Sequence, residues 1–231
     1  MQLSFIIPAL ARNHELDRCI AAIQSAITSH ELYEIIVICP PDSVMDIEAG
    51  FPMARVVIET RKSIYGAMND GIRVAKGEFL YFLGQDDIVL SGFEKLIQEL
   101  KDDVTVFDVF WGNKGVYRNF PNRYLLLVRN ICHQGVVYRK SLFYSHGVFC
   151  TRFRVQADHF MNIKLFWSKP EAPSISYRKQ VFSHYSANGF STTEKDRVFH
   201  ELYPLILRHY VGRLAASLLI ARRFLMRRLK F

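Results

Sequence analysis

The chain has 231 residues, with 30 Lys and Arg against 22 Asp and Glu, and half of its residues are hydrophobic. This composition excludes a collagen-like or intrinsically disordered protein, and the length suits one domain with an extension or two small domains. Seven of the basic residues follow Glu201, whereas no acidic residue does. The body of the chain is therefore nearly neutral, and almost all of the net charge of +8 belongs to the C-terminal segment.

The four cysteines form no C-x-x-C pair and no regular framework, which favours free thiols in a reducing compartment. The N-terminus shows neither the basic region nor the cleavage site of a secretory signal. The longest apolar run, Leu214 to Ala221, is far shorter than the roughly 20 residues that span a bilayer. We therefore expect a cytoplasmic protein, soluble or peripheral at the inner face of the cell membrane.

Continuous apolar runs alternate with helical periodicity in the first half of the chain. Runs without polar alternation predict strands buried on both faces of a parallel sheet. The predicted order is strand 3–8, helix 14–29, strands 34–39 and 54–59, helix 64–76, strand 79–83, helix 91–101 and strand 104–111. The strand at 79–83 delivers Asp86 and Asp87 to its carboxyl end, the edge at which open α/β sheets bind ligands.

The second half of the chain is less regular. A strand at 135–138, a helix at 155–167 and a helical pattern from residue 201 onward are the elements that periodicity predicts. Pro204 marks an early turn in that last segment, and Gly212 is a weak point. Because no repeat or low-complexity linker divides the chain, we expect one compact unit with two lobes.

Adjacent carboxylates at Asp86 and Asp87 repel each other unless a cation or a donor-rich ligand compensates them. Carboxylate oxygens, waters and a diphosphate are the usual surroundings of Mg²⁺ or Mn²⁺. The alternative is a solvated turn in which one of the two side chains caps the following helix.

The order of several motifs resembles family 2 glycosyltransferases of GT-A fold, and most of all the bacterial enzymes of exopolysaccharide and lipopolysaccharide assembly. The motifs are Ile64-Tyr-Gly-Ala-Met-Asn-Asp-Gly-Ile72, Ala75-Lys-Gly-Glu78, Phe82-Leu-Gly-Gln-Asp-Asp87, His133-Gln134, Ala157-Asp158 and Asn188-Gly-Phe-Ser191. The resemblance covers about residues 1–195 and implies an α/β, Rossmann-like three-layer sandwich with a mostly parallel central sheet, followed by C-terminal amphipathic helices. It divides the chain into a nucleotide-binding part (1–112), an acceptor-binding part (113–200) and a basic tail (201–231).

The resemblance also implies roles for individual residues. Asp87 would ligate the divalent metal that bridges the diphosphate of a sugar nucleotide, and Asp86 would hold the ribose or the water shell of that metal. Pro8, Ala9 and the loop after them would border the base. Asp158 would accept the proton of the acceptor hydroxyl in a single inverting displacement; the alternative is that it caps the helix that follows.

Some positions depart from the family pattern. The strand that usually ends in an acidic residue ends here in Cys39, and Asp42 is a candidate substitute for that base contact. Gly66 and Arg61 replace residues that are acidic in the family. Arg61 is thus a candidate contact to a diphosphate or an acidic sugar, or else a solvated cation.

Two further polar residues have both a functional and a structural interpretation. Asn69 either caps backbone groups near the sugar or simply lies on a helix. His133 either binds a metal, a phosphate or acceptor hydroxyls, or is a hydrogen-bonded structural residue.

The C-terminal segment has an apolar stripe with basic residues largely off it. The stripe consists of Val211, Leu214, Leu218, Ala221, Leu225 and Leu229. Such a helix suits an anionic membrane surface, here through residues 205–231. The alternatives are that the stripe packs on the body or on a second subunit. We expect no nucleic-acid partner, because the segment lacks aromatic platforms and a known binding motif.

These observations predict an inverting glycosyltransferase that uses Mg²⁺ or Mn²⁺ and moves a sugar from a UDP- or GDP-sugar to a hydroxyl of a lipid-linked or oligosaccharide acceptor in bacterial surface polysaccharide synthesis. One alternative is a catalytically impaired, membrane-recruited binding subunit. Another is a sugar nucleotidylyltransferase, although the loop after the first strand lacks the glycine-rich sequence of those enzymes. An oxidoreductase is disfavoured because G-x-G-x-x-G is missing.

Overall fold

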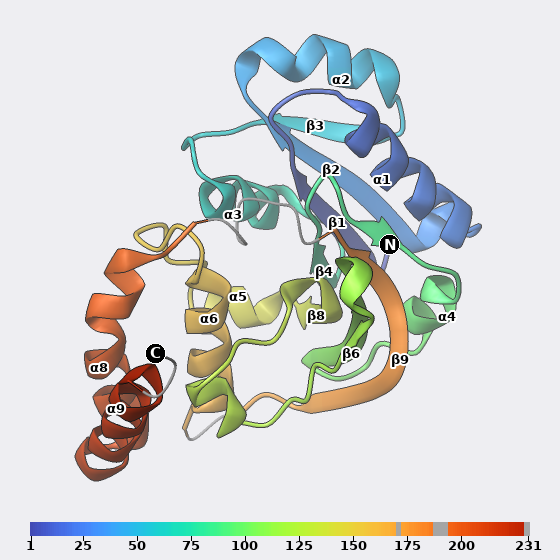
Figure 1. Cartoon of the computed structure of the whole chain (residues 1–231). Coiled ribbons are helices and arrows are strands. Elements are labelled where there is room, and N and C mark those ends of the chain that lie inside the picture. The colour runs from blue at the N-terminus through green and yellow to red at the C-terminus, as the bar shows by residue number, and fades with distance from the viewer. Residues whose placement is uncertain (170–171, 187–193, 229–231) are drawn as a thin grey trace.

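The computed structural model describes residues 1–169, 172–186 and 194–228, with backbone alone for 222–228. Within these residues one sheet has the strand order β3-β2-β1-β4-β8-β6-β9-β5, with β7 paired to β6 (Figure 1). The strands are β1 (Leu3–Pro8), β2 (Tyr33–Cys39), β3 (Ala54–Ile58), β4 (Phe79–Phe82), β5 (Ile88–Val89), β6 (Val104–Trp111), β7 (Val116–Tyr117), β8 (Val136–Arg139) and β9 (Ile175–Tyr185).

The first half of the sheet is parallel. β1 lies between β2 and β4, and β3 pairs with the outer side of β2, all in the same direction. β8 then runs antiparallel to both β4 and β6, whereas β9 runs parallel to β6. The parallel half places the carboxyl ends of β1, β2 and β4 at one edge, where open α/β sheets bind ligands.

Helices cover both faces of the sheet. They are α1 (His14–Ala26), α2 (Val44–Gly50), α3 (Ile64–Val74), α4 (Phe93–Gln98), α5 (Ser141–Ser145), α6 (Ala157–Phe166), α8 (Arg197–Val211) and α9 (Arg213–Arg228). Successive residues of a strand point to opposite faces. Phe5 and Ile7 therefore belong to the hydrophobic cluster that includes side chains of α1, α2 and α4, while Ile6 belongs to the cluster that includes side chains of α3, α5, α6 and α8. The chain thus forms the three layers that the sequence predicts.

Local signals begin the two helices beside the ligand edge. The side chain of Asn13 accepts a hydrogen bond from the backbone of Leu16 at 2.9 Å and caps α1. Ser63 does the same for Gly66 at the start of α3, at 3.0 Å. Each cap satisfies a backbone donor that would otherwise lack a partner, and so sets the residue at which the helix starts.

Periodicity did not reveal every element. The long strand β9 was missed because it mixes polar and apolar residues, and its register against β6 shifts around Asp108. α2 and α5 were missed because they are only seven and five residues long. β9 matters for the site, since it brings Ser183 and the following Ser186 to the carboxyl end of β4.

The C-terminal segment forms two helices. α8 begins at Arg197, continues through Pro204 and packs Phe199, Tyr203 and other apolar side chains on α6 and its neighbours, so the expected boundary at residue 200 falls inside it. The expected turn at Pro204 is absent. Gly212, at φ 85°, separates α8 from α9, because positive φ costs glycine little.

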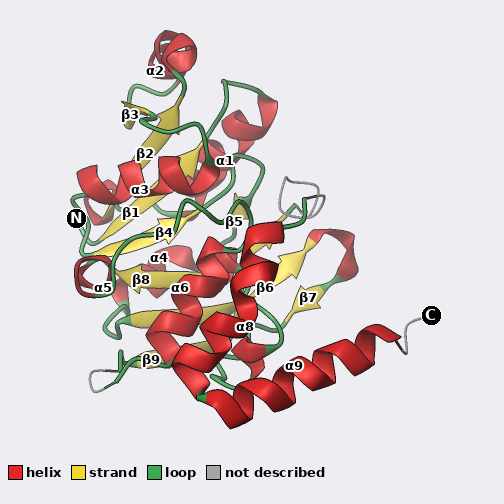
Figure 2. Cartoon of the chain, turned by 90° about the vertical axis from the view of Figure 1, so that its left-hand side faces the viewer, coloured by secondary structure: helices red, strands yellow, loops and turns green. Residues whose placement is uncertain are grey.

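As far as Ala221, where its side chains are described, α9 packs on the rest of the protein with one face. Ala216 is fully buried, and Leu219 and Ile220 are partly buried against the same cluster. Leu214 and Leu218 lie on the expected stripe, and they are 86% and 74% exposed. Figure 2 shows α9 along one edge of the molecule, with α8 and the rest of the protein on one side of it. The stripe therefore does not pack on the body at these positions; the opposite face of the helix does.

Candidate active site

The candidate site lies at the carboxyl ends of β1 and β4. Hydrogen bonds join the loop after β1 to the loops after β4 and β2. The backbone N–H of Leu10 donates to Gln85 Oε1 at 3.2 Å, and Ser43 Oγ donates to the carbonyl of Leu10 at 2.8 Å. Ala9 donates its N–H to the carbonyl of Ile38 at 2.9 Å. These bonds gather the ends of β1, β2 and β4 around one edge.

Asp87 is fully buried, and hydrogen bonds hold its carboxylate. Oδ2 accepts from the backbone of Gly84 at 2.7 Å and from Gln134 Nε2 at 2.8 Å, and Oδ1 accepts from the backbone of Ser186 at 3.3 Å. A carboxylate in this position anchors the loop after β4 to the neighbouring loops. It presents no exposed surface to a ligand.

Asp86 is half-buried, and its carboxylate accepts a short hydrogen bond from Ser186 Oγ. Both carboxylates fold back over Gly84: a Cβ on that residue would lie 2.7 Å from Asp86 Oδ1 and 3.0 Å from Asp87 Oδ2. Glycine is therefore required at position 84 if both acids are to keep their places. Of the pair, only Asp86 keeps exposed surface.

The two acids interact electrostatically. Burial, and then the charge of Asp86, raise the pKa of Asp87 to about 7, against hydrogen bonds from Gln134, Gly84 and Ser186 that lower it. A dication beside the pair would oppose both causes of the raised pKa of Asp87. It would compensate the negative charge of Asp86, and it would stabilise the carboxylate of Asp87 in place of the water that burial removes. The donor set therefore fits Mg²⁺ or Mn²⁺.

No group of three or more His, Cys, Asp or Glu side chains gathers into a metal cage within the described residues. This agrees with the usual binding of Mg²⁺ through one or two carboxylates together with substrate phosphates. Asp86 would hold such an ion directly, with Asp87 behind it. The prediction that Asp87 is itself a ligand stays a prediction, and the burial of Asp87 favours Asp86 for that role.

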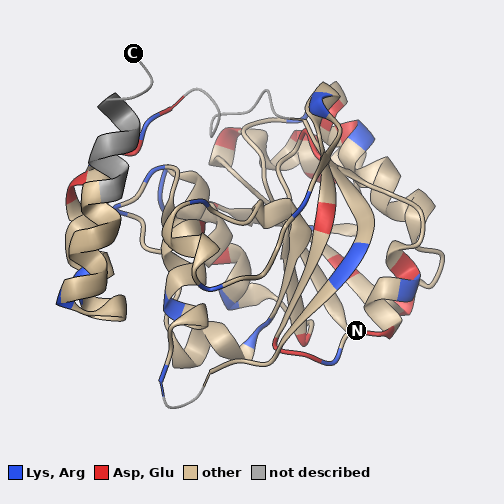
Figure 3. Ribbon diagram, turned by 60° about the horizontal axis from the view of Figure 1, so that its bottom comes forward, with Lys and Arg blue, Asp and Glu red and all other residues tan. Residues whose placement is uncertain are grey.

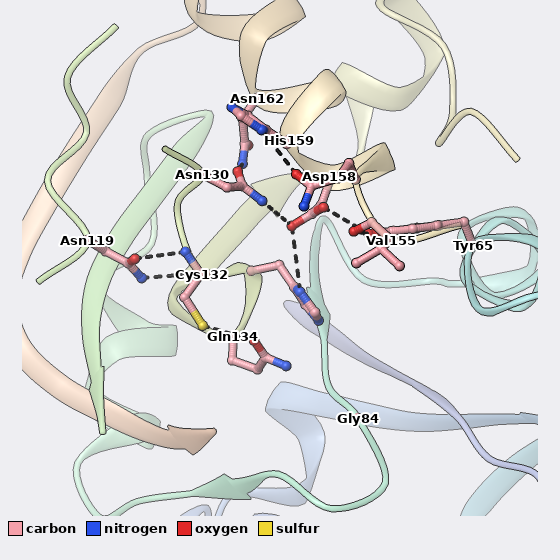
Figure 4. Close-up of polar contacts among 12 residues, drawn as sticks. Tyr65, Gly84, Asn119, Asn130, Cys132, Gln134, Val155, Asp158, His159 and Asn162 are labelled. Atoms are coloured by element: carbon pink, nitrogen blue, oxygen red, sulfur yellow. Dashed lines mark hydrogen bonds and ion pairs between the residues drawn. The ribbon is translucent and has the colours of Figure 1, made fainter. Parts of the chain in front are cut away.

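Asp158 lies in the first turn of α6, and only 7% of its side chain is exposed. Oδ1 accepts a hydrogen bond from the hydroxyl of Tyr65 at 2.8 Å, and Oδ2 accepts from Asn130 Nδ2 at 2.6 Å (Figure 4). Nδ1 of His133 lies 3.7 Å from Oδ2. Three groups thus surround the carboxylate: Tyr65 on α3, and Asn130 and His133 on the segment that leads into β8.

The short 3₁₀ helix His133–Gly135, here called the 133–135 turn, connects the two acidic centres. His133 faces Asp158, and the next residue, Gln134, donates to Asp87. The carbonyl of Gln134 accepts hydrogen bonds from Tyr81 and Ser183, each at 2.6 Å. The position of the histidine is therefore fixed by the bonds that hold the adjacent glutamine.

Asn119 holds the entry to this turn. Its side-chain amide accepts from the backbone N–H of Cys132 at 2.8 Å and donates to the carbonyls of Cys132 and Phe107 at 3.1 and 2.9 Å (Figure 4). Gly135 lets the turn approach so closely, because a Cβ there would lie 2.0 Å from Asn119 Nδ2. A buried, fully bonded amide of this kind rigidifies the backbone that it holds.

The structure places the predicted base-binding residues at the expected edge. Pro8 ends β1, Ala9 is buried beside it, and Asp42 is exposed in the short 3₁₀ helix Pro41–Ser43 after β2. Ser43 contacts the loop after β1. Asp42 therefore borders the same loop as Ala9, which is where a base contact was expected.

Asn69 and Arg61 make contacts that the sequence did not indicate. The side-chain amide of Asn69 bonds both backbone groups of Phe149, at 2.9 and 3.0 Å, so both ends of its amide are occupied. The exposed guanidinium of Arg61 donates to Thr151 Oγ1 at 3.1 Å. Both residues hold the segment that leads into α6, and Asn69 caps backbone groups, which is one of the two roles that the sequence left open.

Sequence reasoning did not single out Tyr65, Asn130 or Gln134 as site residues. Tyr65 is 5% exposed, and its hydroxyl bonds Asp158 and the carbonyl of Val155, both at 2.8 Å. The only signal in the sequence was that Tyr65 and Gln134 lie within the quoted motifs. Asn188-Gly-Phe-Ser191 lies outside the described residues.

A hollow of about 210 Å³ adjoins Asp158 on the side of α8, and its lining includes Asn130, Gln156, His159 and Tyr203. The rings of His159 and Tyr203 both pack near Phe199, with centroids 5.3 and 5.1 Å away. Because Asn130 also bonds Asp158, one wall of the hollow is shared with the acidic site.

Comparisons with known proteins agree with this architecture. Residues 4–160 match the family model described as glycosyl transferase family 2. PGL/p-HBAD biosynthesis glycosyltransferases of Mycobacterium bovis and Mycobacterium tuberculosis are 31% identical over 225 residues, which covers 89% of this chain and 85% of theirs.

Solved structures share the fold. The chain superposes on S. aureus TarS 1–349 in complex with UDP-GlcNAc with a TM-score of 0.74 at 16% identity, covering 100% of this chain and 73% of that one. For the mannosyltransferase PcManGT of Pyrobaculum calidifontis in complex with GDP-Man and Mn²⁺, the TM-score is 0.59 at 14% identity, with 97% and 80% covered. Since the matched segment spans the acidic loop after β4 and the start of α6, the chain belongs to glycosyl transferase family 2 and is a glycosyltransferase of GT-A fold.

Proposed function

We propose that this enzyme transfers a sugar from a nucleotide-sugar donor to an acceptor hydroxyl with inversion at the anomeric carbon, in the synthesis of a bacterial surface glycan. One observation carries the proposal: the acidic loop after β4 and the carboxylate of Asp158 belong to one site, because the 133–135 turn contacts both. An inverting transfer needs a group that stabilises the departing diphosphate and a base opposite to it.

The donor side consists of the edge formed by β1, β2 and β4. Pro8, Ala9 and Asp42 border the place of the base, and Asp86 faces the place of the diphosphate. A bound Mg²⁺ or Mn²⁺ would supply electrostatic stabilisation of the departing nucleoside diphosphate. The complexes of TarS with UDP-GlcNAc and of PcManGT with GDP-Man and Mn²⁺ support a UDP- or GDP-sugar as the donor class.

The acceptor side consists of Asp158 and the adjoining hollow. A sugar ring presents apolar C–H faces and hydroxyl edges, and the aromatic rings and amides of Asn130, Gln156, His159 and Tyr203 offer partners of both kinds. We propose that the hollow receives the saccharide of an oligosaccharide or lipid-linked acceptor. The mycobacterial relatives, which are named for PGL biosynthesis, support a lipid-linked acceptor.

A lipid-linked acceptor would bring the enzyme to the membrane surface, and α9 suits that location. Leu214 and Leu218 are exposed one turn apart, and the segment after Glu201 contains no acidic residue. Charges of both signs are mingled over the rest of the described chain (Figure 3). An anionic membrane would attract the basic segment by about 1 kcal/mol for each Lys or Arg near the surface. No helix among the described residues has the length and apolarity needed to cross a bilayer.

The function can be tested with a panel of nucleotide sugars. A donor that binds the folded protein raises its melting temperature, so the panel is screened with and without Mn²⁺, and each hit is then assayed for transfer and for anomeric configuration. We expect Asp86→Asn to lose metal-dependent donor binding, and Asp158→Asn to keep donor binding while transfer falls by about 10²- to 10⁴-fold.

Asp46→Asn is the matched control, because Asp46 is an exposed carboxylate on α2 that belongs neither to the acidic loop after β4 nor to the surroundings of Asp158. Full transfer by both site variants would remove the assignment of the site. A product with retained configuration would remove the single displacement.

A further inference from the structure

The carboxylate of Asp158 is one end of a chain of hydrogen-bonded side chains that leads into the core. Oδ2 of Asp158 accepts from Asn130 Nδ2 at 2.6 Å, and Oδ1 of Asn130 accepts from Asn162 Nδ2 at 3.2 Å (Figure 4). Oδ1 of Asn162 accepts in turn from the hydroxyl of Tyr138 on β8, at 2.8 Å. Asn162 and Tyr138 are both fully buried, so a substrate does not reach them.

The helix α6 supplies two members of this chain on one face. Asp158 and Asn162 are four residues apart, and residues at this spacing lie one turn apart on the same side of an α-helix. The amide of Asn130 lies across that face, with its donor end on the first residue and its acceptor end on the second. The helix therefore fixes both partners of Asn130 relative to each other.

The partners of the two amides decide which way each amide points. The donor and acceptor ends of an amide have nearly the same shape, so its orientation follows from its neighbours. An ionised carboxylate only accepts hydrogen bonds, which assigns the NH₂ group of Asn130 to Asp158 and its oxygen to Asn162. The oxygen of Asn162 then needs a donor in the core, and the hydroxyl of Tyr138 supplies it. Burial, and next the charge of Asp158, raise the pKa of Tyr138, so this hydroxyl keeps the proton that it donates.

The other hydrogen-bond donor to Asp158 is shared. The hydroxyl of Tyr65 has one proton and two acceptors, Oδ1 of Asp158 and the carbonyl of Val155, each at 2.8 Å. Nδ1 of His133 lies 3.7 Å from Oδ2 of Asp158, beyond the ordinary range of a hydrogen bond. The amide of Asn130 is therefore the firmest donor to the carboxylate, and its position decides how the carboxylate is turned.

A base must meet the proton of the acceptor hydroxyl at hydrogen-bond distance. An oxygen of an ionised carboxylate accepts two hydrogen bonds, so each oxygen of Asp158 keeps a lone pair beside the donor that it already has. Donors that fix the plane of the carboxylate also fix the direction of these free lone pairs. Asn130 lines the hollow that adjoins Asp158, so the same side chain borders the base and the proposed place of the acceptor.

We propose that Asn130 is a positioning residue that sets the direction of the Asp158 carboxylate, and that Asn162 and Tyr138 hold the amide of Asn130 in the orientation that this requires. This rests on the proposed function, in which Asp158 is the base, and it names the groups that prepare that base for the acceptor. A group that takes part in a reaction needs support of this kind from the residues behind it.

Asn130→Ala in the full-length chain tests the near end of the chain. Without this donor the carboxylate can turn, and a misplacement of about 1 Å at a reacting group costs on the order of 10²-fold in rate. We expect kcat for transfer to fall about 10- to 10²-fold. The dissociation constant of the nucleotide-sugar donor, measured by calorimetry with Mn²⁺, should stay unchanged, because Asn130 belongs to the acceptor side.

Tyr138→Phe tests the far end. It removes one hydroxyl and keeps the ring, which packs on Phe82 and Phe143. We expect kcat to fall about 3- to 10-fold, the equivalent of one lost hydrogen bond, with unchanged KM for both substrates. Added to Asn130→Ala, the same change should cause no further fall, because the amide that the hydroxyl orients is then absent. Tyr33→Phe is the matched control, since its buried ring carries a hydroxyl that contacts His30 beside the start of β2.

The possible results separate the proposals. A fall in kcat in both single variants, with intact donor affinity and no further fall in the double variant, supports the chain from Tyr138 to Asp158. Unchanged kcat in either single variant overturns it, as does a loss of donor affinity. Falls that multiply in the double variant also overturn it, because they show that the two residues act independently. If the unmodified enzyme transfers no sugar from any donor, the proposed function fails; if it transfers sugar and both variants do so equally well, only the present inference fails.

Discussion

Asp87→Asn provides a quantitative test of how the acidic loop is built. The carboxyl group of Asp87 has a pKa of about 7 in the folded protein, against an ordinary value of 3.8. A group whose pKa is raised by folding stabilises the protein fully below its unfolded value, and this contribution is lost as the pH rises through the folded value. The metal-free protein should therefore lose stability through this group between about pH 4 and pH 7.

The magnitude follows from the same two values. At about 1.4 kcal/mol for each pH unit, the rise from 3.8 to about 7 corresponds to about 4 kcal/mol. Asparagine does not titrate, and it can still accept the hydrogen bonds of Gly84 and Gln134 through its carbonyl oxygen. The variant should therefore gain up to about 4 kcal/mol relative to the unmodified protein between pH 4 and pH 8.

The assay is urea denaturation of both proteins in EDTA at several pH values, with Asp46→Asn as the control. The expected result is that the difference in the free energy of unfolding between the unmodified protein and Asp87→Asn changes through this range, while the difference to Asp46→Asn stays constant. Parallel stability curves for the unmodified protein and Asp87→Asn would refute the assignment of Asp87 as a buried carboxyl group that folding makes harder to ionise.

Three more predictions concern the surroundings of the site. Asn69→Ala removes both bonds to the backbone of Phe149, and we expect about 1 to 3 kcal/mol less stability by urea denaturation; an unchanged midpoint would show that these bonds do not hold the segment before α6. Gly84→Ala should weaken Mn²⁺-dependent donor binding at least tenfold in calorimetry, because its Cβ would displace Asp86, and unchanged affinity would contradict the close approach. Leu218→Asp should reduce flotation with vesicles of anionic lipid while transfer to a water-soluble acceptor stays constant, and equal flotation would exclude α9 as the membrane contact.

The sequence by itself determined the parallel half of the sheet and the location of the acidic loop at its carboxyl edge. β1, β2 and β4 were predictable because a strand buried on both faces is a continuous apolar run, and such a run needs no partner to be recognised. Asp86 and Asp87 follow one of these runs directly, so their place at the edge follows from the strand. The order of motifs then indicated the family, because several motifs in order are far more specific than one.

The sequence did not reveal the roles within the acidic pair. Asp86 and Asp87 are neighbours with the same chemistry, and only folding buries Asp87 beneath Gln134, which lies 47 residues later in the chain. Asn69 finds its partner 80 residues away, and Tyr65 finds Asp158 at a distance of 93 residues. Such contacts have no local signature, because a side chain at a given position is compatible with many partners.

The C-terminal segment shows the same division. Its helical periodicity and its basic charge were legible in the sequence, and α8 and α9 are helices as expected. Which face of α9 is covered was decided by the packing of Ala216, Leu219 and Ile220, and this left Leu218 exposed. Periodicity determines which residues share a face of a helix, whereas only the tertiary structure determines what that face meets.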